Sequence, residues 1–249
     1  MAKGIGLIAV SDHDTVAGVL IAEGLARHAG LRFLRSAEVS TDLGGRLFHV
    51  LAYGVDLTDS SFLSMLEANA QELRGSNQSI MRNLVGAGFA IDWQDYLSYE
   101  DDPRRGGFRE LNFLVERGVC RDVWDFFDTV LSGVTYERPK YVSLIKAVEV
   151  IRAAGGVPIA AHPGGSLRDV EVSEKTLTPL IAAGVAGLEC FSQYHDAEMM
   201  AFCADFCCRR GLLVTGGSDF HGGFVGRQMG VPVVTTEELV LGELLSMVS

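Results

Sequence analysis

The sequence predicts an α/β protein built from parallel strand–helix units. Short apolar runs, which suit buried strands, alternate along the chain with longer amphipathic stretches, which suit helices. Glycine is frequent, with 29 residues in 249, as expected for a chain with many strand-to-helix turns. Strands that alternate with helices favour a parallel arrangement, because each helix carries the chain back to the start of the next strand.

Six apolar runs are predicted to form strands. They are residues 5–10, 31–38, 47–53, 157–161, 187–191 and 212–215. A turn signal rich in glycine, 42–45, separates the second run from the third. Most of these runs end in polar or glycine-rich residues, the positions where an α/β fold builds its binding sites.

Helical patterns fill the remaining chain in two different ways. Beside the strands, the predicted helices are 15–29, 143–154, 175–183, 196–210 and 237–248. Between 56 and 139 the strand signals fade, and the predicted helices are 60–73, 76–86, 108–117 and 121–131. We therefore expect residues 1–55 and 140–249 to form one α/β domain, and 56–139 to be a mainly helical insert.

Composition and charge restrict the class of function. The net charge of −11 argues against a nucleic-acid polymer as substrate, because such a surface needs a basic patch. A small phosphorylated molecule is compatible with this charge, since bound divalent cations supply positive charge locally. The sequence contains neither an apolar run long enough to span a membrane nor the pattern of a signal peptide, so we expect a cytoplasmic protein. It carries no signal for the oligomeric state.

Four of the six histidines lie in or directly after an apolar strand-like run, and two acidic residues end such runs. In a barrel of parallel strands these positions converge on one face. Imidazoles mixed with carboxylates suit zinc, manganese or iron better than calcium or magnesium. The candidate metal ligands are His13, Glu38, His49, His162, Asp219 and His221.

Each candidate also has a simpler interpretation when it is taken alone. His49 would be a core histidine, and His13, between two aspartates, would belong to a helix-capping turn. Glu38 would pair with a basic neighbour, and His162 would open a turn before a proline. Asp219 and His221, two residues apart after glycines, fit no such interpretation easily. The coincidence of all six favours a metal site.

Five motifs resemble those of the PHP (polymerase and histidinol phosphatase) superfamily, in the same order along the chain. The similarity is greatest to its small stand-alone bacterial phosphoesterases, the TrpH-like group, and it extends over nearly the whole chain. The motifs are Ser11-Asp12-His13-Asp14-Thr15, Ala37-Glu38, Phe48-His49-Val50, Ala161-His162-Pro163-Gly164 and Gly217-Ser218-Asp219-Phe220-His221-Gly222.

This resemblance implies a distorted seven-stranded (βα) barrel with a helical insert and a site that hydrolyses phosphate esters. The site would hold two or three divalent metal ions, manganese, iron or zinc. By the same resemblance His13 and His221 would share one metal, and Glu38 would bridge the other two. His49 and His162 would bind one of that pair, and Asp219 the other.

The sequence departs from the family pattern at its beginning. Relatives open with a strand that carries His-x-His, upstream of the segment that corresponds to residues 4–14. This strand, with up to three ligands, is apparently missing from this chain, so we expect either an omitted N-terminal segment or a truncated relative. The metal between Glu38 and Asp219 would be the one most affected.

Three further residues are candidates for contact with the substrate. His195 follows a strand, where relatives often have histidine, and would bind phosphate or protonate the leaving oxygen; alternatively it lies on the surface beside a helix cap. Arg138, before a Pro-x-Tyr, would bind phosphate oxygens through its guanidinium group. Arg109 would do the same from the insert, unless it pairs with Glu110 or Asp102.

The function predicted from these residues is metal-dependent hydrolysis of a small phosphate ester by metal-activated hydroxide. The substrate would be a phosphomonoester or cyclic phosphodiester, for example a nucleotide or a sugar or alkyl phosphate. One alternative within the enzymes is a nuclease or exonuclease, and another is carbon–nitrogen hydrolysis at a similar site. A non-catalytic, degenerate PHP module that binds a ligand or partner is the alternative from a different class.

Overall fold

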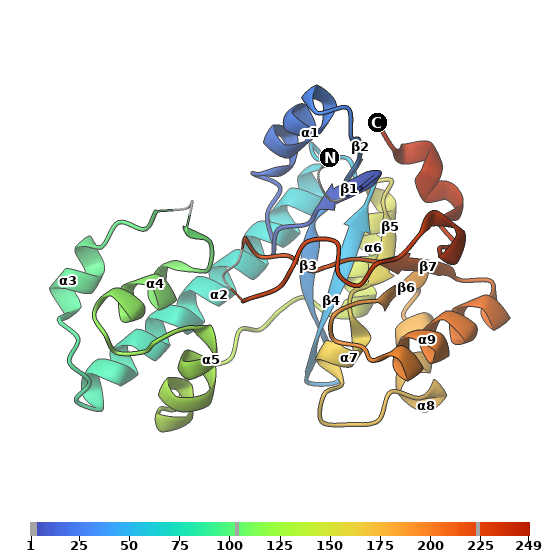
Figure 1. Cartoon of the computed structure of the whole chain (residues 1–249). Coiled ribbons are helices and arrows are strands. Elements are labelled where there is room, and N and C mark those ends of the chain that lie inside the picture. Colours follow the sequence, from blue (N-terminus) through green and yellow to red (C-terminus); the bar gives the residue numbers. More distant parts are fainter. Residues whose placement is uncertain (1–3, 103–104, 223–224) are drawn as a thin grey trace. The chain divides into compact units, whose positions relative to one another are not determined.

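The computed structural model describes residues 4–102, 105–222 and 225–249, and Figure 1 traces the chain. These residues divide into two compact units. The first unit comprises Met1–Ala70, Tyr141–Ser218 and Gly230–Ser249, and the second comprises Gln71–Lys140 and Asp219–Met229. The boundaries predicted from the sequence, 1–55 with 140–249 and 56–139, stay a prediction beside this division.

Strands in the first unit form two sheets. In the smaller sheet, β1 (Leu7–Val10) pairs in parallel with β2 (Arg32–Arg35). The larger sheet has the order β3-β4-β5-β6-β7 (Figure 1). Its strands are β3 (Glu38–Leu43), β4 (Arg46–Tyr53), β5 (Val157–Ala160), β6 (Gly187–Phe191) and β7 (Leu213–Gly216).

The larger sheet is mixed, which corrects the expectation of parallel strands throughout. Strands β5, β6 and β7 are parallel, but β4 is antiparallel to both β3 and β5. The predicted turn between β3 and β4 is a two-residue hairpin loop in which Gly44 and Gly45 both have positive φ, 65° and 82°. Such a loop returns the chain beside itself, so the two strands that it joins must be antiparallel.

The apolar run at 31–38, predicted to be one strand, is divided between β2 and β3. Strand β2 pairs with β1, whereas β3 pairs with β4, and the change of partner falls at Ser36 and Ala37. Main-chain hydrogen bonds continue along β4 through this junction, from Gly54 N–H to the oxygen of Arg35 and from Ala52 N–H to that of Ala37, both 2.8 Å. The junction therefore links the two sheets.

The strand pairings among the described residues do not close a barrel. On the side of β7 away from β6, Val214 and Val240 exchange two main-chain hydrogen bonds of 3.0 Å. The last part of the chain, and not β1, is therefore the neighbour of β7 at this position.

Helices of the first unit pack on the strands. Helix α1 (Val19–His28) contacts β1 and β2, α6 (Leu144–Ala153) contacts β3, β4 and β5, and α9 (Ala197–Arg210) contacts β6 and β7. The short α7 (Pro163–Ser166) follows β5, and α8 (Glu174–Ala182) precedes β6. Instead of the helix predicted at 237–248, the chain forms the 3₁₀ turns η4 (Thr236–Glu238) and η5 (Gly242–Met247), because Gly242 adopts a positive φ.

The second unit is helical and has a hydrophobic core of its own, which includes Met81, Leu84 and Phe113. Helix α2 (Ser60–Gly86) enters it from the first unit without a break at Gly75, where two helices were predicted, because one glycine weakens a helix without ending it. The other elements are α3 (Trp93–Ser98), α4 (Arg109–Glu116), α5 (Val123–Asp125), the π-helical η2 (Phe126–Val130) and η3 (Leu131–Gly133).

Helix α3 was not predicted from the sequence. Asp92 caps it by accepting hydrogen bonds from the main-chain N–H groups of Gln94 and Asp95. A helix of only six residues gives a weak apolar period, so its cap is the stronger signal. Over the described ranges of the chain, no helix is long and apolar enough to cross a membrane.

An ion pair between the buried Glu23 of α1 and the half-exposed Arg35 of β2 gives the fold a testable pH dependence. Arg35 donates three hydrogen bonds to the carboxylate of Glu23. These bonds lower the pKa of Glu23 below its ordinary value of 4.5. The pair therefore stabilises the fold above pH 4.5, and this contribution is lost as the pH falls through the lowered pKa.

Arg35→Ala should lower the free energy of unfolding at pH 7 by about 1 kcal/mol, because it leaves a buried carboxylate without its main donor. We expect the difference in the free energy of unfolding between wild type and Arg35→Ala to shrink as the pH falls through the lowered pKa of Glu23. Urea unfolding at several pH values measures it. Lys146→Ala, which breaks an exposed pair with Glu149, is the matched control and should have little effect. A pH-independent loss in Arg35→Ala would contradict the assignment.

Candidate metal centre

The main chain at Glu38 is held against the loop that follows β1. Glu38 N–H donates to the oxygen of Asp12 at 3.1 Å, and Asp14 N–H donates to the oxygen of Glu38 at 2.8 Å. These two bonds flank His13, which is thereby placed beside Glu38. Asp14 has a positive φ of 50°, and its carboxylate accepts hydrogen bonds from Ser40 N–H and the amide of Asn69. The loop that carries His13 is thus fixed from two sides.

Strand register brings His49 and His162 to the same place. His49 in β4 is paired with Ser40 in β3, and Ser40 lies two residues after Glu38, so all three side chains share one face of the sheet. The oxygen of His49 accepts a hydrogen bond from Ala161 N–H at 2.9 Å. Because Ala161 immediately follows β5, the next residue, His162, comes to lie beside Glu38.

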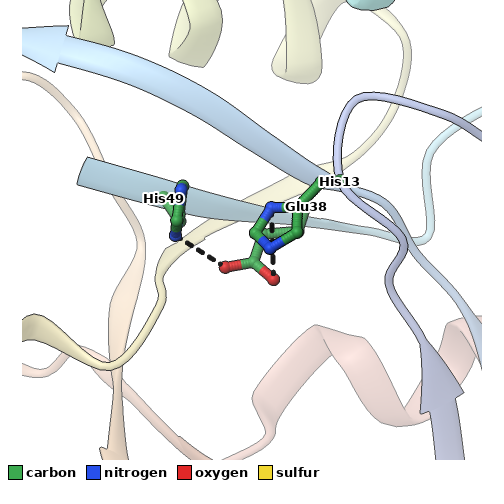
Figure 2. A group of neighbouring side chains, drawn as sticks. All are labelled: His13, Glu38 and His49. Atoms are coloured by element: carbon green, nitrogen blue, oxygen red, sulfur yellow. Dashed lines mark ion pairs between the residues drawn. The ribbon is translucent and has the colours of Figure 1, made fainter. Parts of the chain in front are cut away.

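We call His13, Glu38, His49 and His162 the Glu38 cluster. One carboxylate oxygen, Oε1, lies 3.1 Å from Nδ1 of His49 and 3.0 Å from Nε2 of His162. The other oxygen, Oε2, lies 3.9 Å from Nδ1 of His13. Figure 2 shows the carboxylate of Glu38 beside the rings of His13 and His49, with dashed lines marking its ion pairs to both. One ligand atom from each of these three residues lies within 4.8 Å of the other two, as a common metal ion would require.

Two buried ring nitrogens of the cluster have no hydrogen-bond partner, Nδ1 of His49 and Nδ1 of His162. The 3.1 Å approach of the His49 nitrogen to Glu38 is therefore a close contact without hydrogen-bond geometry. A buried polar atom without a partner is unfavourable, and a cation would satisfy a ring lone pair. Nitrogen and carboxylate donors in this combination suit zinc, manganese or iron. The residues present therefore fit a divalent metal.

Charge within the cluster is mutually stabilised. Burial alone would raise the pKa of Glu38, but the rings of His13 and His49 and the hydrogen bond from His162 hold this pKa well below its ordinary value. Burial lowers the pKa of His49, so this ring tends to be neutral. Burial would also lower the pKa of His162, but the hydrogen bond to Glu38 outweighs it and raises this pKa. Glu38 is thus ionised, as a metal ligand must be.

His195 is buried beside the cluster, and both of its ring nitrogens contact the main chain. Nδ1 lies 2.7 Å from the oxygen of Cys190 and donates to it, and Nε2 accepts a hydrogen bond from Gly164 N–H at 3.0 Å. Burial lowers the pKa of His195, in agreement with a neutral ring in this role. These contacts hold the loop after β5, and the proton transfer or phosphate contact predicted for His195 stays a prediction. The burial of His195 is contrary to the alternative that this residue lies on the surface beside a helix cap.

Asp219 and His221 belong to the second unit, where they lie together. Arg227 forms a hydrogen-bonded ion pair with the carboxylate of Asp219, and Nδ1 of His221 lies 2.7 Å from the oxygen of Asp219. A carbonyl oxygen only accepts, so the neutral His221 ring carries its proton on Nδ1 and its lone pair on Nε2. Asp219 has a positive φ of 44°. The assignment of both residues as metal ligands stays a prediction.

The two arginines predicted to bind substrate differ in their surroundings. The guanidinium group of Arg109 donates hydrogen bonds to the main-chain oxygens of Tyr96 and Tyr99. It also lies 4.5 Å from the centre of the Tyr96 ring. It also lies 3.8 Å from the carboxylate of Glu110, the alternative partner considered above. Arg109 thus holds the end of α3, and its contact with substrate stays a prediction. Arg138 is exposed, and its contact with substrate stays a prediction.

Glu189 is a buried residue that the sequence analysis missed. It lies within β6, is 5% exposed, and accepts a hydrogen bond from His162 N–H at 2.9 Å. The available signal was its place in Gly187-Leu188-Glu189-Cys190-Phe191, since a carboxylate in the middle of a buried apolar run needs partners. The ring of Tyr194, also missed, packs 4.8 Å from that of His162.

Comparisons with known proteins give the class of this site. No protein-family model matches the chain. The chain is 30% identical over 236 residues to a 3',5'-nucleoside bisphosphate phosphatase of Chromobacterium violaceum, covering 92% of this chain and 82% of the relative. It is 27% identical to a phosphoribosyl 1,2-cyclic phosphate 1,2-diphosphodiesterase of Eggerthella lenta, covering 89% and 85%. It is 28% identical to the Escherichia coli 5'-3' exoribonuclease Rnm, covering 87% and 75%.

Solved structures resemble the whole chain as well. A crystal structure from Bifidobacterium adolescentis, described as a proposed metal-dependent phosphoesterase, aligns with a TM-score of 0.82 at 27% identity, covering 99% of this chain and 87% of that one. A structure of an amidohydrolase from Chromobacterium violaceum, with bound sulfate and no metal, aligns with a TM-score of 0.77 at 27% identity, covering 100% and 88%.

The chain therefore belongs to the PHP family of metal-dependent phosphoesterases, as the motifs predicted. These enzymes are hydrolases, and the Glu38 cluster supplies the histidine and carboxylate side chains that a metal site in such an enzyme requires.

Divalent metal is expected to stabilise the wild-type protein, because the Glu38 cluster is predicted to bind it in the folded state only. At a free concentration of 100 times Kd the free energy of unfolding should rise by about 2.7 kcal/mol. Glu38→Gln keeps the shape of the side chain but removes the charge, so most of this stabilisation should disappear. Thermal unfolding with and without Mn²⁺ or Zn²⁺ measures the effect, with the exposed Glu149→Gln as control. Equal stabilisation of all three proteins would place the metal elsewhere.

Proposed function

We propose that this chain hydrolyses a small phosphate ester, a phosphomonoester or a cyclic phosphodiester, with divalent metal ions held in part by the Glu38 cluster. The observation that carries the proposal is the buried carboxylate of Glu38 beside three imidazoles, two of which have buried ring nitrogens without hydrogen-bond partners. Membership of the metal-dependent phosphoesterase family gives this cluster its expected chemistry.

The chain's own residues would divide the work as follows. Glu38 would hold more than one ion, His49 and His162 would bind one of these, and His13, which lies beside Glu38, would bind an ion as well. Asp219 and His221 are proposed as further metal ligands. Two or three ions of manganese, iron or zinc would neutralise phosphate charge and make a water more acidic. Arg138 would contact phosphate oxygens, since a guanidinium group pairs well with them.

Charge and the relatives' activities support a small substrate. The chain has a net charge of −11, which disfavours a long anionic polymer. The relatives from Chromobacterium violaceum and Eggerthella lenta are named for a nucleoside bisphosphate and a cyclic phosphate. The sulfate in the second solved structure is a tetrahedral anion like phosphate, so it supports an anion site in this fold.

Exoribonuclease activity is the second candidate function. Relatives from Haemophilus influenzae and Escherichia coli, 27% and 28% identical to this chain, are named 5'-3' exoribonucleases. Both candidates use phosphoester hydrolysis, so the same metal ligands serve either one. They differ in affinity for a polymer, which should fall steeply with salt if several phosphates are bound.

Wild-type protein with Mn²⁺, Fe²⁺ or Zn²⁺ should release phosphate from a 3',5'-nucleoside bisphosphate or open a cyclic phosphodiester. We expect little turnover of a 5'-phosphorylated oligoribonucleotide at the same concentration. A panel of these three substrates at two salt concentrations separates the candidates. Faster, salt-sensitive turnover of the oligoribonucleotide would favour the second candidate. Turnover of amides but of no phosphate ester would contradict both candidates.

His162→Ala and Asp219→Ala should each abolish turnover and lower the bound metal while the fold is retained. The exposed His28→Ala, which removes an imidazole at the end of α1, is the matched control and should keep full activity. Metal content, circular dichroism and turnover are measured on the same samples. If wild-type protein binds less than one ion per chain and has no activity, the chain is a binding module and the proposal is wrong.

A further inference from the structure

We propose that Glu189 is a positioning residue that orients the metal ligand His162 through its main chain. Glu189 Oε2 accepts a hydrogen bond of 2.9 Å from His162 N–H. This contact involves the main chain of His162 and not its imidazole ring. The inference rests on the proposed function, because it concerns the same metal site. It adds a residue whose contact is with a ligand's backbone.

His162 needs such support because its backbone is strained. Its φ is 24° and its ψ is 63°, in the left-handed region that residues with a Cβ rarely adopt. A residue remains in such a conformation only where its surroundings hold it there. The strain falls at the junction between β5 and α7, where the chain turns to direct the imidazole at Glu38. Loss of the supporting contact would therefore let the ring move.

Glu189 is held where it can give this support. Its side chain projects from the middle of β6 and is 5% exposed, so the ionised group is favourable only while hydrogen bonded. Its second oxygen, Oε1, lies so close to Gly217 that a Cβ there would come within 2.6 Å of it. The carboxylate is thereby packed between the loop that carries His162 and the residue after β7.

The segment after β6 gives the loop a second support. His195 accepts a hydrogen bond from Gly164 N–H while its other nitrogen donates to Cys190, in the same strand as Glu189. A Cβ at Gly164 would come within 2.6 Å of the His195 ring, so only glycine allows this approach. Two main-chain N–H groups of the loop, two residues apart, are therefore held by side chains from β6 and its following turn.

The experiment compares two substitutions that differ in one property. Glu189→Gln keeps a carbonyl oxygen able to accept from His162 N–H, whereas Glu189→Leu fills similar space and cannot accept. Affinity for Mn²⁺ or Zn²⁺ is measured by competition with a chromophoric chelator. We expect Glu189→Leu to bind metal about 10–100-fold more weakly, the usual effect of losing a supporting residue, and Glu189→Gln to stay close to wild type. Glu23→Gln, a buried carboxylate paired with Arg35, is the matched control.

A second readout examines the hydrogen bond itself in metal-free protein. Labelling with ¹⁵N-histidine gives at most six main-chain amide signals, and His162→Gln identifies the one of interest. A carboxylate acceptor should move the His162 amide proton downfield. Glu189→Gln should shift it upfield, because an uncharged acceptor bonds less strongly, and Glu189→Leu should also speed its exchange with solvent. This readout needs only Glu189→Gln if Glu189→Leu does not fold.

Three results would overturn the inference. Metal affinity unchanged in Glu189→Leu would mean that His162 is held without Glu189. Equal weakening in both Glu189 variants would mean that the charge matters and the acceptor does not. An unshifted His162 amide in Glu189→Gln would mean that the hydrogen bond is absent. If wild-type protein binds no divalent metal, the proposed function fails, whereas the amide measurement still decides the role of Glu189.

Discussion

Burying the carboxylate of Glu38 among three imidazoles is the constraint that organises the first unit. An ionised group in this position is stable only if its partners surround it, and those partners come from separate segments of the chain. The loop after β1, the middle of β4 and the end of β5 must therefore meet at the start of β3. Main-chain hydrogen bonds fix the chain at these points: Glu38 N–H donates to the oxygen of Asp12, Asp14 N–H donates to the oxygen of Glu38, and Ala161 N–H donates to the oxygen of His49.

The support extends beyond the residues that would touch a metal. A two-residue glycine turn sets the register between β3 and β4 and so the distance from Glu38 to His49. On the other side, Glu189 and His195 hold the strained loop of His162. Metal sites depend on such supporting contacts, because a ligand that is free to turn binds its ion less tightly. The fold and the chemistry are linked through these few contacts.

Much of the site was predictable from sequence, because motif spacing identifies which side chains carry chemistry. His13, Glu38, His49 and His162 were all expected to meet, and they do. The route by which they meet was not predictable: Glu38 begins a strand instead of ending one, and β4 is antiparallel, since apolar periodicity does not reveal a strand's partner. The parts played by Glu189 and His195 depend on hydrogen bonds between segments: a carboxylate in an apolar run indicates that Glu189 needs partners, but not which residues these are.

The most direct test of the account is a crystal structure of the zinc-loaded protein with anomalous scattering measured at the zinc edge. The account predicts an anomalous peak within coordination distance of a Glu38 carboxylate oxygen, about 2.0–2.2 Å, and of at least one imidazole nitrogen of the Glu38 cluster. Anomalous peaks only elsewhere on the protein, with Glu38 still in direct contact with His49 and His162, would contradict it.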